Sequence, residues 1–163
     1  VTTLLQNFDT MPSNVLLIAA TNHEHLLDPA IWRRFNLTIT LGLPNKIQRL
    51  TLLQKWMGEY AINETLDYDT LSKITDGLNG AQIKELTKAA AKKYYINKNL
   101  NTDDIIAIFI QQQTMYSVSN EDTIKLLSEL NNKGISLRTL AKATGVTHST
   151  LDYRIKKYRG GQV

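Results

Sequence analysis

The sequence predicts a mainly α-helical fold with two short strands near its N-terminal end. Residues 14–20 form a continuous apolar run, which is typical of a strand buried on both faces of a parallel sheet. Residues 37–43 alternate between apolar and polar side chains, as expected of a second strand nearer an edge. After Pro44 every periodic segment repeats at helical spacing. Because the connection between the two strands is short, we expect them to be parallel neighbours, a remnant of a parallel α/β core.

Four helices are predicted in the middle of the chain. Asn45 and Thr102 are expected to cap the first and the last, and residues 69–76 to form the second. Asn79 is expected to cap a long third helix, with Gln82 at the position that completes a capping box. These helices would form a small bundle.

The last part of the chain is predicted to form three short helices. The first begins at Asn120, and the second covers residues 137–144. Gly145 supplies a left-handed turn residue, and Thr147 caps the third helix. The spacing of Ala141, Gly145 and Leu151 resembles a helix-turn-helix motif.

Charge and composition limit the function classes. Residues 1–116 carry 11 basic and 11 acidic side chains, whereas residues 117–163 carry 8 basic and 4 acidic ones. A basic terminal segment on a neutral body favours a polyanionic partner, although a merely solvated basic end remains an equal alternative on charge alone. There are no cysteines and three histidines without metal-ligand spacing, so we expect no metal site and interpret the chain as cytoplasmic. No apolar run is long enough to cross a bilayer, and no membrane partner is expected.

Asn22 and the pair Arg33 and Arg34 are the candidate catalytic residues. A polar side chain at the end of a strand points into the crevice of a parallel sheet, where an amide can orient a water beside a phosphate. A rigid guanidinium just before the next strand can neutralise a phosphoryl group, including one bound by a neighbouring subunit. Taken alone, Asn22 could equally close an Asx turn, and the arginines would more often form a surface ion pair with Glu24 or Asp28.

The order of these motifs resembles the second region of homology of the AAA ATPase family. It contains Ala-Ala-Thr-Asn22, then Leu27-Asp28-Pro29-Ala30, Arg33-Arg34-Phe35 and Leu43-Pro44. The resemblance implies that Asn22 is sensor 1 and that Arg33 and Arg34 are trans-acting fingers in a ring, usually a hexamer. It assigns residues 1–43 to the C-terminal part of the large ATPase subdomain and 44–116 to the helical lid. The polar boundary near residue 116 and the turn motif of the last helices assign residues 117–163 to a helix-turn-helix domain.

The segment from Gly77 to Ile83 resembles the start of the lid's nucleotide-facing helix in the same family. Gly80 and Ala81 would leave room there for a flat adenine ring. An ordinary well-capped helix explains the same residues. No arginine occupies the motif, so an arginine-type sensor 2 is not predicted.

The sequence contains no GxxxxGK[ST] phosphate cradle and no apolar strand that ends in Asp-Glu. The family resemblance implies ATP and Mg²⁺ as cofactors of the intact protein. We expect neither to bind this chain alone, and we expect no hydrolysis by it. Because the chain also begins without Met, we interpret it as a piece of a longer protein.

The outward face of the last helix is the candidate DNA-binding surface. Short polar side chains at its start suit base edges, and basic ones at its end suit phosphates. The predicted contacts with duplex DNA are Ser149, Thr150, Tyr153, Arg154, Lys156, Lys157 and Arg159.

The leading hypothesis is therefore the C-terminal fragment of an AAA ATPase that couples hydrolysis to remodelling of DNA or of DNA-bound protein complexes. One alternative is a stand-alone DNA-binding regulator with a vestigial ATPase half. Another is a protein unfoldase whose tail recruits a protein substrate.

Overall fold

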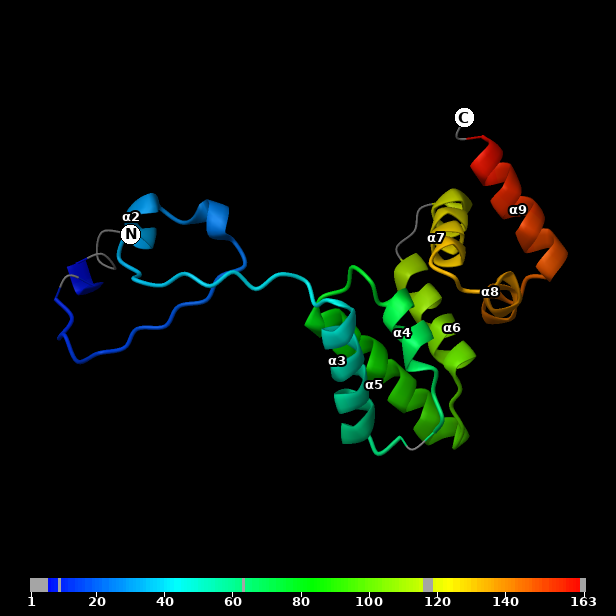
Figure 1. Ribbon diagram of the computed structural model, residues 1–163, viewed down its shortest axis with the longest axis horizontal. Coiled ribbons are helices and arrows are strands. Elements are labelled where there is room, and N and C mark those ends of the chain that lie inside the picture. The colour runs from blue at the N-terminus through cyan, green and yellow to red at the C-terminus, as the bar shows by residue number, and fades with distance from the viewer. Residues whose placement is uncertain (1–5, 9, 63, 116–118, 162–163) are drawn as a thin grey trace. The chain divides into compact units, whose positions relative to one another are not determined.

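The computed structural model describes residues 6–8, 10–62, 64–115 and 119–161 of the chain (Figure 1). The chain divides into two compact units, Val1–Gly42 and Leu43–Val163. The first unit is mostly irregular, and the second consists of packed helices. The further division of the second unit at residue 116 stays a prediction.

The N-terminal unit contains two short helical segments, η1 (Glu24–Leu26) and α2 (Pro29–Trp32). Asp28 caps α2, because its carboxylate accepts a hydrogen bond of 2.8 Å from the backbone N–H of Ala30. Proline occupies the first helical position, where its missing N–H costs nothing. Ile31 on the same helix is buried.

The two predicted strands are absent, because no strand occurs anywhere in the described residues. Residues 14–20 and 37–43 instead carry large apolar side chains into solvent, and Leu16, Ile18 and Leu41 are 85%, 80% and 91% exposed. A strand exists only when a partner strand accepts and donates its backbone hydrogen bonds. The apolar patterns correctly mark side chains suited to burial, but they carry no information about that partner. The structure therefore does not confirm the predicted remnant of an α/β core.

The second unit confirms the predicted helices, with small shifts at their ends. The helices are α3 (Lys46–Glu59), α4 (Tyr68–Ile74), α5 (Gly80–Asn97), α6 (Thr102–Thr114), α7 (Asn120–Asn132), α8 (Leu137–Thr144) and α9 (His148–Gly160). None of the helices in the described part of the chain is long and apolar enough to span a bilayer.

Local capping explains where the long helices begin. Asn79 forms the predicted reciprocal capping box with Gln82. Asn45 caps α3 as predicted, and it also forms a capping box, with Gln48, that was not predicted. The prediction that Thr102 caps α6 is wrong. Asn101 is the cap, and the Thr102 hydroxyl instead accepts a hydrogen bond of 2.9 Å from the backbone N–H of Asp67. The Thr102 side chain therefore makes a long-range contact with Asp67 and does not cap the helix, as the local sequence pattern had predicted it would.

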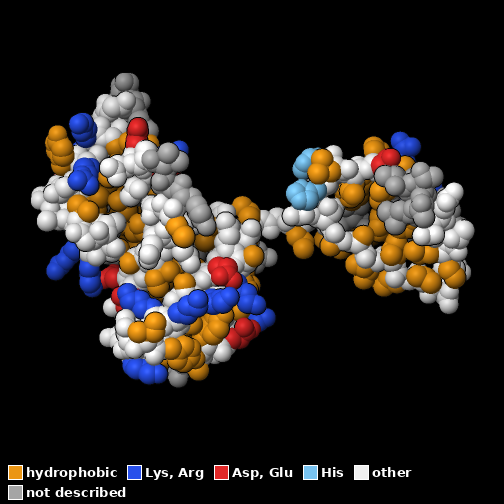
Figure 2. Space-filling view, turned by 180° about the vertical axis from the view of Figure 1, so that it is seen from behind, with side chains coloured by type: hydrophobic (Ala, Val, Ile, Leu, Met, Phe, Trp, Pro, Cys, Tyr) orange, Lys and Arg blue, Asp and Glu red, His pale blue; other side chains and the backbone are white. Residues whose placement is uncertain are grey.

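One hydrophobic core runs through the whole helical unit. Its fully buried members include Leu53 of α3, Leu71 of α4, Ile83 of α5, Ile106 of α6, Leu130 of α7, Leu140 of α8 and Leu151 of α9. Helix α6 packs against α5 and α4 as well as α8, so it connects the bundle to the last three helices. Figure 2 shows a face of this unit on which basic side chains form a band beside exposed apolar ones.

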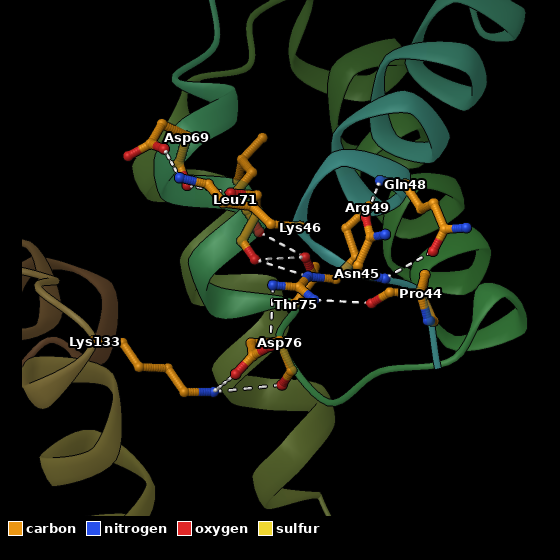
Figure 3. A network of polar contacts seen from close by, with 11 residues as sticks. Pro44, Asn45, Lys46, Gln48, Arg49, Asp69, Leu71, Thr75, Asp76 and Lys133 are labelled. Carbon is orange, nitrogen blue, oxygen red and sulfur yellow. Dashed lines mark hydrogen bonds and ion pairs between the residues drawn. The ribbon is translucent and has the colours of Figure 1, made fainter. Parts of the chain in front are cut away.

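A buried arginine joins the entrance of the unit to two of its helices (Figure 3). The guanidinium of Arg49 donates 2.9 Å to the Pro44 carbonyl and 3.1 Å to the Ser72 carbonyl. Its remaining nitrogen lies 3.0 Å from one carboxylate oxygen of Asp76, whose other oxygen lies 3.3 Å from Lys133 after α7. We call these five residues the Arg49 junction.

Replacing Arg49 by Met should lower the free energy of unfolding by about 2 to 4 kcal/mol, because buried carbonyls and the Asp76 carboxylate lose their donor. Lys46→Met, one turn earlier and in an exposed ion pair with Asp69, should cost less than about 1 kcal/mol. Urea denaturation measures both. Equal losses would contradict the role of the junction.

The ion pairs of Asp69 should make the stability of the folded chain sensitive to acid. Hydrogen bonds from Lys46 and then Lys73 lower its pKa from 3.8 to about 2. A carboxyl group with a lowered folded-state pKa stabilises the fold above its unfolded pKa, and this contribution disappears as the pH falls through the folded value. The wild-type melting temperature should therefore fall more steeply between pH 4 and pH 2 than that of Asp69→Asn. Parallel curves over this range would contradict the assignment.

Candidate functional site

The three predicted catalytic residues lie exposed in the N-terminal unit. Asn22 occupies a bend before η1. Arg33 follows α2 directly as its C-terminal cap residue, and its backbone N–H bonds to the Ile31 and Pro29 carbonyls. Arg34 extends one guanidinium nitrogen to the Ala30 carbonyl at 3.0 Å. The last turn of α2 therefore sets the backbone position of both arginines, and both side chains are exposed.

The predicted adenine-facing residues lie at the start of α5. A Cβ built on Gly80 would lie 4.0 Å from the ring of Trp56, an ordinary contact, so packing alone does not require glycine there. Ala81 is exposed beside a shallow groove of about 270 Å³ that Gln82 and Glu85 also line. No lysine or arginine lines this groove.

These residues do not form a complete site for ATP and Mg²⁺. The groove beside Ala81 could accept an uncharged ring, but its one charged side chain is a carboxylate, which repels phosphate. The sequence has no glycine-rich cradle to supply phosphate-binding amides. Among the described residues, no three histidine or acidic side chains gather as metal ligands.

The last two helices have the local geometry that the sequence predicts. Gly145 ends α8 with φ of +69°, a left-handed conformation that favours glycine. Thr147 then caps α9, and the intervening turn is three residues long. Leu151 and Ile155 are buried against the other helices. DNA binding by this arrangement stays a prediction.

The seven predicted DNA contacts are not equivalent in the structure. Tyr153, Arg154 and Lys157 of α9 are exposed, and Tyr153 is 66% exposed. Arg154 also lines a groove that α9 forms with α6 and α7. Lys156 is exposed but forms an ion pair of 2.7 Å with Asp152 one turn earlier.

At the start of α9 the hydroxyl groups take part in the cap. Thr150 Oγ1 lies 2.8 Å from Thr147 Oγ1, and Ser149 Oγ lies 3.4 Å from the same atom. Thr150 is also half-buried. These two side chains would have to change partners in order to contact a base edge.

The Arg159 side chain contacts α7, whereas the sequence predicted that it faces outward toward DNA. Its guanidinium donates to Ser128 Oγ at 2.9 Å and to the Ser128 carbonyl at 3.2 Å. It also donates to the side-chain carbonyls of Asn131 at 3.1 Å and Asn132 at 2.7 Å. Arg159 therefore ties the end of α9 to the end of α7. The signal in the sequence is the cluster of Ser128, Asn131 and Asn132, whose helical spacing brings three acceptors together.

Comparison with known proteins places this chain among ATPases. It is 40% identical over 78 residues to the ribosome biogenesis ATPase RIX7 of Saccharomyces cerevisiae, covering 47% of this chain and 9% of that protein. It is 38% identical over 91 residues to the proteasome-activating nucleotidase of Methanothermobacter thermautotrophicus, covering 53% and 22%. It is 31% identical over 121 residues to a cell division cycle protein 48 homolog of Archaeoglobus fulgidus, covering 72% and 16%.

The chain belongs to the AAA family of ATPases. No family model matches it, and no solved structure matches it. The matches to the three AAA relatives span less than a quarter of the length of each. The predicted family resemblance is confirmed, while the roles of the individual residues stay predictions.

Replacing Arg159 by Met should lower the free energy of unfolding by about 1 to 2 kcal/mol, because four hydrogen bonds between α7 and α9 are lost. Lys157→Met removes the same charge from an exposed position of the same helix and should change stability by less than about 0.5 kcal/mol. Chemical denaturation distinguishes the two. A neutral Arg159→Met would mean that the guanidinium is free to contact a ligand.

Proposed function

We propose that this chain forms the C-terminal part of an AAA ATPase subunit that couples ATP hydrolysis to the remodelling of a macromolecular complex. The observation that carries the proposal is the exposed pair Arg33 and Arg34 after α2, in a chain that belongs to the AAA family. ATP and Mg²⁺ would be the cofactors of the intact protein, and other subunits of a ring, by family resemblance usually a hexamer, its partners.

The proposed roles of this chain and of a neighbouring subunit follow from the groups that this chain has and lacks. The chain has two exposed guanidinium groups positioned by a helix end but no phosphate cradle of its own. Arginines so placed can donate to phosphate oxygens held by a neighbouring subunit and neutralise their charge. Asn22 would orient a water in its own subunit, and Gly80 and Ala81 would face the adenine. Each of these roles is a proposal about the assembled ring.

In the assembled ATPase that contains this chain, Arg33→Ala or Arg34→Ala should lower turnover by about 10³-fold, since an arginine finger stabilises charge in the transition state. Nucleotide binding should remain close to that of the wild type. Steady-state hydrolysis and a fluorescent nucleotide titration measure the two quantities. Lys46→Ala, another exposed cation, is the control. If both variants hydrolyse ATP at the wild-type rate, the two arginines have no catalytic role and are only surface residues.

A second element of the proposal concerns the remodelled substrate. Helix α9 presents the exposed side chains of Tyr153, Arg154 and Lys157 beyond a tight three-residue turn, which suits a duplex DNA groove. The basic excess of residues 117–163 supports the same partner. We therefore propose DNA or a DNA-bound protein complex as the substrate. A protein unfoldase whose tail recruits protein, and a stand-alone DNA-binding regulator, are the alternatives.

Titration of the full chain with duplex DNA should show an affinity that falls steeply with salt, because phosphate contacts release counterions. Replacing both Lys156 and Lys157 by Ala should weaken binding to all sequences and reduce the slope of log K against log salt by about two. Arg154→Ala should instead change sequence preference.

Arg159 provides an internal control in this experiment. Because its guanidinium is engaged with α7, Arg159→Gln should leave the salt slope unchanged even if it lowers affinity. The absence of DNA binding at low salt would reject the DNA proposal and favour recruitment of a protein substrate.

A further inference from the structure

A groove between α5 and α6 has large apolar side chains at its mouth. Its volume is about 410 Å³, and Ala89 and Ile96 of α5 line it together with Ile108 and Met115 on the other side. Ile96 is 80% exposed and Met115 is 72% exposed. Two large exposed apolar side chains from different segments, beside an open groove, form a surface that gains free energy when it is covered.

A ridge of lysines runs along α5 and reaches this groove at Lys92. Lys84, Lys88 and Lys92 follow one another at intervals of four residues on α5, and all three are exposed. Four helical residues rise about 6 Å, so the ammonium groups recur once per turn along one side. Like charges at this spacing destabilise an isolated helix. Lys92 belongs to the ridge and also lines the groove.

The electrostatics of this surface are one-sided. No aspartate or glutamate lines the groove. Lys93, which also lines it, is paired with Asp104 at 2.7 Å. On the ridge, Lys88 lies 3.7 Å from Glu85, a long and exposed pair that screens it weakly.

We propose that the α5–α6 groove and its lysine ridge are a docking surface for an acidic amphipathic helix of a partner protein. Apolar side chains of that helix would cover Ile96 and Met115 and enter the groove. Its carboxylates, spaced four residues apart, would lie opposite Lys84, Lys88 and Lys92 at the same rise per turn. The equal spacing of the carboxylates and the lysines would fix the register of the partner helix on α5. Burial of the apolar side chains would supply the binding free energy.

The apolar component distinguishes this partner from nucleic acid. A phosphate backbone would satisfy the lysines, but it would leave Ile96 and Met115 without apolar contact. The groove also lies on α5 and α6, whereas the proposed DNA contacts lie on α9. The docking surface is therefore independent of the proposed DNA face, and either proposal can fail without the other.

The test uses the full chain and a fluorescent synthetic helix of roughly four turns, with Glu at every fourth position and Leu on the adjoining face. Fluorescence anisotropy at low salt should show saturable binding that weakens as salt is added. The same peptide with Lys in place of Glu should not bind. Absence of saturable binding by the Glu peptide would overturn the proposal.

Three variants locate the binding surface. Ile96→Gln should weaken binding about tenfold, since an apolar anchor is lost, and Lys92→Glu should weaken it roughly fivefold. Lys125→Glu makes the same charge change on α7 and should leave the affinity unchanged. Because all three side chains are exposed, the melting temperature should stay at its wild-type value.

Two further results would overturn the proposal by naming another occupant. If duplex DNA displaces the peptide and Lys92→Glu weakens DNA binding, the ridge is a nucleic-acid contact. If the chain associates with itself and Ile96→Gln abolishes this in sedimentation analysis, the groove is an interface between copies. Equal weakening by Lys92→Glu and Lys125→Glu would reduce the effect to net charge and would also overturn it.

Discussion

The guanidinium of Arg49 is the contact on which the arrangement of the helical unit depends. It bonds to the chain entering the unit at Pro44, to the carbonyl of Ser72 in α4, and to Asp76 just beyond α4. Asp76 in turn meets Lys133 at the end of α7, through its carboxylate and its backbone carbonyl. Because the arginine is almost fully buried, removing any one partner leaves a polar group unsatisfied away from water. The junction therefore favours one relative placement of these three segments.

This constraint has a functional consequence for an AAA ATPase. Residues 43–163 share one hydrophobic core, and α6 packs on both the preceding bundle and α8. Under the proposed function, a movement of the bundle linked to the nucleotide would carry α7 to α9 with it as one body. The exposed face of α9 and the groove beside α5 would then move together, which is how hydrolysis could be transmitted to a bound macromolecule.

Much of the helical unit could be predicted from the sequence because its signals are local. Asn45 and Asn79 cap their helices through contacts within three residues, and Gly145 needs only its own backbone freedom. The strands predicted at 14–20 and 37–43 are absent, because a strand depends on a partner elsewhere that the local pattern does not reveal. The same holds for individual side chains. Arg159 is basic and exposed by pattern, yet acceptors 27 to 31 residues away hold it against α7. Family resemblance identified Arg33 and Arg34 as candidates, and their roles depend on a neighbouring subunit that no single chain reveals.

Native-state hydrogen exchange on the full chain tests the central claim, that the bundle and the last three helices form one cooperative body. We expect the most protected amides of α7, α8 and α9 to exchange with the same opening free energy as those of α3, α5 and α6, because both groups open only when the shared core does. They should also lose protection together as denaturant is added. If α7 to α9 open at a much lower free energy while α3 to α6 stay protected, the last helices are a separate domain. The contact between Asp76 and Lys133 would then not couple the movement of α7 to α9 to that of the bundle.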